Sequence, residues 1–460
     1  MIVINRAMMV VHSTLVLMLS GAVQQASGFG EGPCTPIWDT AIGQPGTGRI
    51  HDMVVFDDGS GSGPQLYAAV GVGGLRVAKW NGTSWISLGS GMNSPVLALA
   101  VFNDGTGAAL YAGGSFVLAD GVPVNRLAKW TGTTWQSVGG GVTGGASVVN
   151  VMTVHNDGSG SALYVAGAFG NAGPVPAGNI AKWNGSSWAA LGTGVFGNVS
   201  SSVHALLSVG STLYVGGEFS HAGGFTSPFL VNRIARWNGT SWSGLGTGMN
   251  FGSMVESLAV FDDGLGGGPL LHAGGTFTMA GDVAANGVAK WNGSSWSPLG
   301  AGLTGSPGYA RALAVFDDGN GLALYAGGQF SGAGGTAANR IAKWDGIQWS
   351  PLGAGVSSWI ETLRVHEDNT GDGPDLYVGG EFTMAGGMTT GKVAVWRGCS
   401  GGPMPGDING DGSVNVSDML AVISQWGNCP VPCPPACAAD VNGNCVVDVA
   451  DLLLVISNWG

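Results

Sequence analysis

Apolar and alternating runs recur in groups of four along most of the chain, separated by turns rich in Gly, Asn and Asp. In one such group the runs cover residues 312–316, 324–328, 340–344 and 349–353. Alternation with a period of two, bounded by strong turn residues, is typical of antiparallel strands. Each group therefore predicts one four-stranded sheet.

The groups repeat about every 53 residues, and tryptophan marks each copy. One Trp ends the third run, at Trp80, Trp130, Trp183, Trp237, Trp291, Trp344 and Trp396. Another begins the fourth run, at Trp85, Trp135, Trp188, Trp242, Trp296 and Trp349, and Trp38 supplies the missing member of this series. Repeats of this length with four strands are typical of propeller blades. We expect an all-β, seven-bladed β-propeller over residues 34–399, whose N-terminal strand closes the last blade.

If the chain is exported, its six cysteines indicate disulfides. Cys34 would lie just before the closing strand and Cys399 just after its partner strand, so we expect a Cys34–Cys399 disulfide. The other four, Cys429, Cys433, Cys437 and Cys445, allow three pairings, all of which stay open.

Each pair of tryptophans stands five positions apart around a turn, so we expect the two rings to meet across a hairpin and pack in the core. Stacking on a sugar ring is the alternative. Glycine pairs such as Gly113-Gly114 and Gly327-Gly328 would let neighbouring sheets approach. These placements resemble kelch-like and galactose-oxidase-like propellers. The resemblance implies architecture only, because a copper site would need clustered Tyr, His and Cys.

The composition contains 86 Gly and 10% charged residues, which would suit disorder, but 17 Trp and 45% hydrophobic residues favour a packed β-structure. The formal net charge is -12. Six of the acids, and no Lys or Arg, follow Gly401. Without a basic patch, nucleic acid is excluded as an expected partner.

At the N-terminus, Arg6 precedes an apolar run over residues 7–23, and small residues follow at Ala26-Ser27-Gly28. This order is typical of a secretory signal peptide, assigned to residues 1–28. A membrane anchor is the competing interpretation. No other stretch approaches 18 apolar residues, so we expect no membrane span in the mature chain and a secreted, extracellular or cell-surface location.

Two similar lines stand near the C-terminus, GDINGDGSVNVSDMLAVISQWG and ADVNGNCVVDVADLLLVISNWG. In the first, oxygen-bearing residues occupy places 1, 3, 5, 7, 9 and 12 of a twelve-residue loop with Gly412 at the turn: Asp407, Asn409, Asp411, Ser413, Asn415 and Asp418. Alternate residues of such a loop can point oxygens at a Ca²⁺ ion.

The second loop repeats this ligand pattern with Asp440, Asn442, Asn444, Val446, Asp448 and Asp451. Cys445 stands where the turn glycine is expected. A non-glycine residue at positive φ costs about 1–2 kcal/mol. The second of the two predicted calcium sites is therefore the weaker candidate.

An apolar helix pattern follows each loop, at residues 419–423 and 452–456, and each line ends in Trp-Gly. The paired unit resembles a type I dockerin over residues 407–460, after a linker at residues 400–406. The resemblance implies a small helical calcium-binding domain that docks onto a cohesin-like domain of an extracellular protein. Loop places 10 and 11 are then partner-recognition candidates: Val416, Ser417, Val449 and Ala450.

Six acidic turns, such as Asp57-Asp58-Gly59, are interpreted as self-capping hairpin turns, with weak calcium binding as the alternative. Other polar residues break the repeat: His51, His155, His204, His221, His272, His366, Glu218, Glu256, Arg311, Glu361 and Glu381. As a sequence pattern they match no triad, metal cluster or glycosidase pair, so the catalytic residues stay unknown.

The sequence favours a secreted, non-enzymatic protein with a recognition or scaffold propeller and a calcium-dependent docking module. Two alternatives stay open. One is a polysaccharide hydrolase or lyase with a catalytic propeller, because dockerins in their family commonly deliver such enzymes, and the other is a lectin-like propeller whose partner is a glycan.

Overall fold

The computed structural model describes residues 36–71, 76–197, 201–223, 230–305, 307–367, 373–398, 416–424, 426–428, 439, 446–449 and 451–452. Within these ranges the chain is nearly all β-structure. Seven sheets have four strands each. All strand pairs within these sheets are antiparallel. The predicted all-β class is therefore confirmed.

Each sheet contains four strands in a fixed order. The first strands are β2 (Ile50–Phe56), β6 (Val96–Asn103), β13 (Val148–Asn156), β20 (Ser202–Val209), β25 (Val255–Phe261), β32 (Tyr309–Asp317) and β38 (Ile360–His366). The second strands are β3 (Gln65–Val70), β7 (Ala108–Gly114), β14 (Ser161–Ala168), β21 (Thr212–Glu218), β26 (Leu270–Gly275), β33 (Leu322–Gln329) and β39 (Asp375–Gly380). The third strands are β4 (Val77–Trp80), β10 (Leu127–Trp130), β17 (Ile180–Trp183), β23 (Ile234–Trp237), β29 (Val288–Trp291), β36 (Ile341–Trp344) and β42 (Val393–Arg397). The fourth strands are β5 (Trp85–Ser87), β11 (Trp135–Ser137), β18 (Trp188–Ala190), β24 (Trp242–Gly244), β30 (Trp296–Pro298), β37 (Trp349–Pro351) and β1 (Ile37–Asp39).

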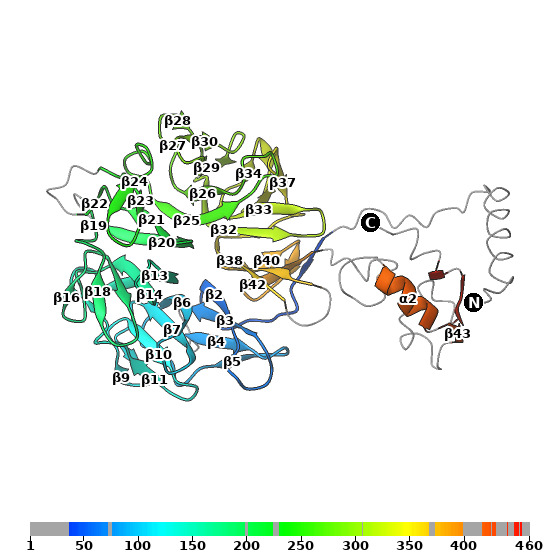
Figure 1. The fold of residues 1–460 in the computed structure, drawn as a ribbon, viewed down its shortest axis with the longest axis horizontal. Helices are drawn as coiled ribbons and strands as arrows, with labels where there is room; N and C mark the ends of the chain where they lie inside the picture. The colour runs from blue at the N-terminus through cyan, green and yellow to red at the C-terminus, as the bar shows by residue number, and fades with distance from the viewer. Residues whose placement is uncertain are drawn as a thin grey trace, which may run out of the picture. The chain divides into compact units, whose positions relative to one another are not determined.

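The first strands form a closed cycle of contacts. Each first strand contacts the first strand of the next sheet, and β38 of the last sheet contacts β2 of the first. Figure 1 shows these strands gathered around a common centre, with the fourth strands toward the outside. Residues on the first strands that face this centre are thereby brought together from sheets far apart in sequence.

Strand β1 is the fourth strand of the last sheet, next to β42, as predicted from Trp38. Trp38 lies opposite Trp396, and the ring centroids are 5.2 Å apart. The remaining tryptophan pairs, in the other sheets, have centroid distances of 5.2–5.5 Å. The predicted meeting of the two rings across a hairpin is confirmed.

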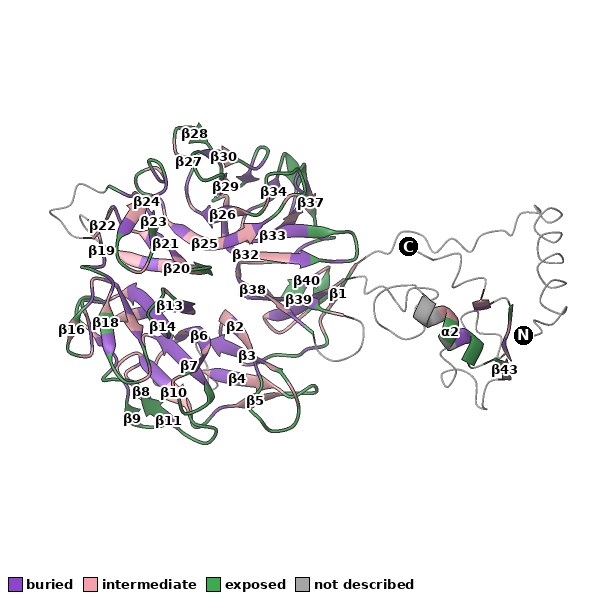
Figure 2. Cartoon of the chain, in the orientation of Figure 1, coloured by how far each residue is buried: buried purple, intermediate pink, exposed green. Residues whose placement is uncertain are grey.

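The core is divided into seven apolar clusters, and each cluster joins two neighbouring sheets. The cluster containing Ile50, Tyr377 and Val395 joins the last sheet to the first. Figure 2 shows the buried residues concentrated in the strands and the exposed ones in the connections. Burial of apolar area between sheets is the main stabilising contribution at these junctions.

The strand ends differ from the predicted ones where the backbone leaves the β region. Strand β36 begins at Ile341 rather than at Arg340, whose φ is 63°. Strand β37 ends at Pro351, two residues before Gly353, whose φ is 54°. Positive φ is incompatible with an extended strand, and apolar patterning carries no information on φ.

Short strands that the sequence did not predict lie mostly between the second and third strands. They are β8 (Leu118–Ala119), β9 (Val122–Pro123), β12 (Val142–Thr143), β15 (Asn171–Ala172), β16 (Val175–Pro176), β19 (Val195–Phe196), β22 (His221–Ala222), β27 (Met279–Ala280), β28 (Val283–Ala284), β31 (Leu303–Thr304), β34 (Gly332–Ala333), β35 (Thr336–Ala337), β40 (Met384–Ala385) and β41 (Met388–Thr389). Two-residue strands are too short to show a period of two.

The C-terminal part contributes helix α2 (Val416–Ser424) and the strands β43 (Gly427–Asn428) and β44 (Val446–Val447), which pair with each other. The predicted signal peptide, the linker, Cys34 and Cys399 lie outside the described residues. Among the helices that the structure describes, none is both long and apolar enough to cross a membrane.

Candidate functional site

The predicted calcium ligands fall only in part within the described residues. Of the first loop, only Asp418 is included, in α2. The second loop contributes Val446, Asp448 and Asp451. The other eight ligand positions, and the recognition candidate Ala450, lie outside the described residues. Val416 and Ser417 form the start of α2, and Val449 is half exposed, at 50%.

Asp448 and Asp451 are held together at the start of a helical turn. Asp451 is fully buried, and its Oδ2 accepts a 2.9 Å hydrogen bond from the backbone N–H of Asp448. The N–H of Leu452 donates to the carbonyl of Asp448. A carboxylate three residues into a helix that accepts the backbone N–H of the residue preceding the helix is one half of a capping box. The carboxylate of place 12 is therefore held beside the backbone of place 9 of the predicted loop, and carboxylate oxygens are ligands that suit a hard cation such as calcium.

A second candidate site lies at the common centre around which the first strands gather, which we call the axis. Each first strand contains a β-bulge there. In every sheet one residue is skipped in the pairing with the second strand. The skipped residues are His51, Leu97, Asn150, His204, Glu256, Arg311 and Glu361. Bulges re-aim a side chain and are frequent beside functional sites.

In five of the seven sheets, a glycine pair of the second strand makes room for the bulge. A Cβ on Gly328 would lie 2.2 Å from the carbonyl oxygen of Tyr309, in the paired strand next to the bulge. A Cβ on Gly327 would lie 2.6 Å from Cγ2 of Ile360 in the next sheet. Gly327 thus allows the close approach of sheets that the sequence predicted, and Gly328 allows the bulge.

All seven bulge residues line a cavity on the axis. A cavity of about 340 Å³ is lined by the seven bulge residues and by Met254. A second one, of about 240 Å³, shares six of the seven and continues among residues that follow the bulges. The larger volume falls within the range of small-ligand sites.

Charged groups of alternating sign follow one side of this ring. Glu361 receives hydrogen bonds from Arg49 on one oxygen, at 3.0 Å, and from Arg311 on the other. Arg49 also bonds Glu381 and lies over the ring of Trp359, 4.9 Å from its centroid. These pairs join the last sheet to both of its neighbours.

Burial sets the protonation of this network. Desolvation raises the pKa of Glu361 above its usual value, although Arg311 and Arg49 oppose this shift. The pKa of His51 is lowered to about 4 by burial and by the nearby positive charges of Arg49 and Arg311. His51 is therefore neutral at pH 7.

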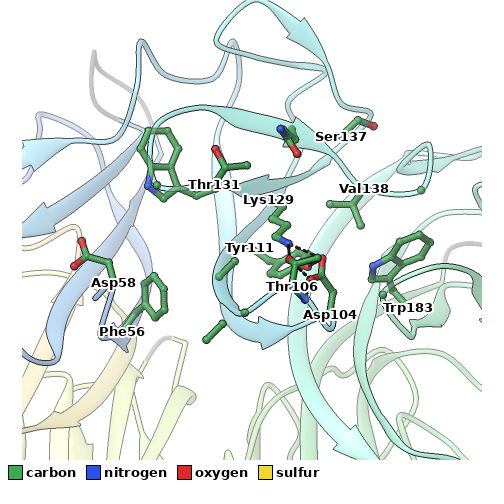
Figure 3. Close-up of a pocket in the computed structure, with 18 residues that line it drawn as sticks. Phe56, Asp58, Asp104, Thr106, Tyr111, Lys129, Thr131, Ser137, Val138 and Trp183 are labelled. Atoms are coloured by element: carbon green, nitrogen blue, oxygen red, sulfur yellow. Dashed lines mark hydrogen bonds and ion pairs between the residues drawn. The ribbon is translucent and has the colours of Figure 1, made fainter. Parts of the chain in front are cut away.

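A different pocket, shown in Figure 3, lies at the first three sheets and contains Asp104, Tyr111 and Lys129. Asp104 accepts bonds from Lys129 at 2.6 Å and from Tyr111 at 2.9 Å. Equivalent Lys–Asp pairs recur at Lys79–Asp58, Lys182–Asp157, Lys290–Asp263 and Lys343–Asp318. This recurrence indicates a structural role in holding the strands.

Five of the six acidic turns are hairpin caps, and the sixth, at residues 367–369, lies partly outside the described residues. Asp57 Oδ1 accepts the backbone N–H of Gly59, as interpreted from sequence, and Asp58 pairs with Lys79. Because a lysine ammonium already neutralises the second carboxylate, a calcium ion there would face like charge. Among the described residues, no group of three or more His, Cys, Asp or Glu side chains is arranged to hold a metal.

Sequence reasoning named five of the seven bulge residues as departures from the repeat but did not bring them together. The sequence contains no local cluster of these residues, because each of them lies in a different copy of the repeat. One signal was available: in five of the seven sheets the bulge residue lies opposite a glycine pair, which marks the position of the first strand that turns to the axis.

Residues 405–459 match the family model of the dockerin type I domain, a domain that generally binds calcium. This match supports a calcium-binding, protein-docking module in the C-terminal segment. No curated protein matches the chain.

Several solved structures are similar to the chain. Two describe the extracellular domain of BT4673 from B. thetaiotaomicron, as part of a one component and of a hybrid two component system, at 10% and 11% identity and TM-scores of 0.48 and 0.47. They cover 78% and 79% of this chain, which spans only 40% of each. The computationally designed Ika8 protein has 14% identity and a TM-score of 0.41, with 78% of this chain and 99% of the designed one covered.

Proposed function

We propose that this chain is an extracellular docking protein, in which a calcium-loaded dockerin module binds a cohesin-like domain and a seven-bladed β-propeller serves as a recognition or scaffold body. The observation that carries the docking function is the dockerin match at residues 405–459. The hydrogen bond from the backbone N–H of Asp448 to the Asp451 carboxylate supports it, because it holds the carboxylate of place 12 beside place 9 of the same loop.

Two further observations support the propeller. The first strands contact one another in a closed cycle, and each apolar cluster joins neighbouring sheets. The proposed domains are a signal peptide at 1–28, the propeller at 34–399, a linker at 400–406 and the dockerin at 407–460. The proposed Cys34–Cys399 disulfide would hold the two ends of the ring together.

The calcium ligands proposed for the two loops give the test. Calorimetric titration of the full chain with calcium is expected to show two sites. Asp418→Ala removes the first and Asp451→Ala removes the second, because each deletes the carboxylate at place 12. Asp262→Ala, at a turn in the sheets, is the matched control and leaves both sites. Calcium binding that is equal in all four proteins would overturn the proposal.

A further inference from the structure

Glu256 is the least satisfied charged group of the axial cavity. Its side chain is only 12% exposed, and Glu256 is one of the residues that line the cavity. Among the residues that the structure describes, none donates a hydrogen bond to it. The nearest basic atom is Nδ1 of His204, at 3.6 Å from Oε2, and this imidazole is charged only if protonated. A carboxylate removed from water without a donor is costly unless a cation joins it.

The guanidinium groups nearby are hydrogen-bonded to Glu361, although Nε of Arg311 is buried without a hydrogen-bond partner among the described residues. Arg311 lines the same cavity but directs Nη1 to Glu361, and Arg49 bonds Glu361 with its own Nη1. The cavity lining therefore has two carboxylates, Glu256 and Glu361, and one guanidinium, that of Arg311. Because both arginines are hydrogen-bonded to Glu361, Glu256 is the carboxylate of this lining to which no guanidinium of the described residues is hydrogen-bonded.

The geometry points to a binding site for a small organic monocation, a ligand with a primary ammonium or guanidinium group that donates hydrogen bonds to Glu256. Such a ligand supplies both the missing donors and the missing charge. Leu97 and Met254 line the same cavity and offer apolar contact to an alkyl stem. A volume of about 340 Å³ accommodates a ligand of this size.

A bare metal ion fits this cavity less well. In the part of the chain that the structure describes, no group of three or more His, Cys, Asp or Glu side chains is arranged to hold a metal, and both oxygens of Glu361 already accept hydrogen bonds from arginines. Calcium requires six to eight oxygen ligands. An ammonium or guanidinium group needs only one carboxylate and brings its own directed donors.

The side chain of a lysine or arginine in a partner protein carries the same chemistry as a free amine. The cavity lies at the end of the first strands that carries Met254, two residues before the bulge, and the paired second strands end at this same face. A projecting side chain could therefore enter there as well as a small molecule. The two sources are distinguished by the probe.

The test is calorimetric titration of the full chain, at saturating calcium, with n-butylamine and with methylguanidinium. Binding of at least one of them is expected, and Glu256→Gln weakens it about tenfold or more through the loss of a charge-assisted hydrogen bond. Glu218→Gln removes a carboxylate at the same face but outside the cavity lining, and it is expected to leave binding of the cation unchanged. A Gly-Gly-Lys-Gly-Gly peptide that binds as tightly as n-butylamine identifies a protein side chain as the source, and a weaker one identifies a free amine.

Three results would overturn the assignment. None of the three cations binds, Glu218→Gln and Glu256→Gln weaken cation binding equally, or butyrate binds more tightly than the cations. If Glu256→Gln does not fold, Leu97→Phe provides the second variant, because it fills the cavity from its apolar side and must abolish binding. The inference does not depend on docking, since Glu256→Gln is expected to keep both calcium sites.

Discussion

Trp38 donates a 3.0 Å hydrogen bond from its indole Nε1 to the carbonyl oxygen of Leu352, 314 positions later in the chain. The fourth-strand tryptophan of every other sheet makes the same bond to the preceding sheet, at Trp85–Ile42, Trp135–Leu88, Trp188–Gly139, Trp242–Leu191, Trp296–Leu245 and Trp349–Leu299. The N-terminal strand thus repeats, from the other end of the sequence, a contact that local repeats make elsewhere.

Replacement of Trp38 is expected to open this junction. Trp38 is 7% exposed, so Trp38→Ala leaves a large cavity and an unpaired carbonyl, at a cost of about 3–5 kcal/mol in the free energy of unfolding. Ile37→Ala, in the same strand but at a residue 61% exposed, costs little. Urea unfolding measures both, and equal midpoints for the two variants would contradict the closing role of β1.

The Lys–Asp pairs should make the protein sensitive to acid. Burial opposes ionisation of Asp157, but hydrogen bonds from Lys182, Ser159 and Tyr164 outweigh it and hold the pKa of Asp157 below its usual value. The stabilising contribution of such a carboxylate is present above the unfolded pKa of about 3.9 and is lost as the pH falls below it.

Lys182→Met isolates this contribution. The variant leaves Asp157, whose side chain is 1% exposed, without its cation and is expected to cost about 3–5 kcal/mol at pH 7. The difference in the free energy of unfolding between the variant and the natural protein shrinks at pH 3, because the isolated carboxyl can then be protonated. Free energies of unfolding at both pH values provide the measurement, and a deficit that stays constant with pH would refute this explanation.

His272 occupies the position at which three other sheets have a tyrosine bonded to the acidic turn. It is 1% exposed, and burial lowers its pKa to about 4. The unfolded pKa is about 6.5, so the folded protein loses stability as the pH falls from about 6.5 to 4, by about 2 kcal/mol between pH 7 and pH 5.

His272→Tyr should remove that loss. The new hydroxyl can donate to Asp263 as Tyr164 donates to Asp157, at 2.7 Å, and adds about 1–2 kcal/mol at pH 7. Thermal unfolding at pH 7 and pH 5 compares the variant with the natural protein. A steeper pH dependence in the variant would count against this assignment.

Sequence patterning predicted the four-strand groups, the tryptophan pairs and the place of Trp38, because each depends on period-two alternation and a fixed repeat length. It did not predict the axial cluster of Glu256, Arg311 and Glu361. These residues are more than 45 positions apart and meet only because the sheets close on one another and each first strand bulges. Neither a bulge nor sheet closure has an apolar period of its own.

Gly328, opposite the bulge at Arg311, should tolerate no side chain. Gly328→Ala places a Cβ against a backbone carbonyl that cannot move without breaking the paired strand, at a cost of about 1–3 kcal/mol or more. Gly267→Ala, where nothing lies within 4 Å, is the control and is expected to be nearly neutral. If chemical denaturation finds the two variants equally stable, the bulge does not require this glycine.

Docking is tested most directly by the calcium dependence of binding between the full chain and a panel of immobilised type I cohesin domains. We predict that at least one cohesin binds with calcium present, that EGTA abolishes the binding, and that added calcium restores it. Binding that is unchanged in EGTA, or no bound calcium on the chain in equilibrium dialysis, would contradict the account.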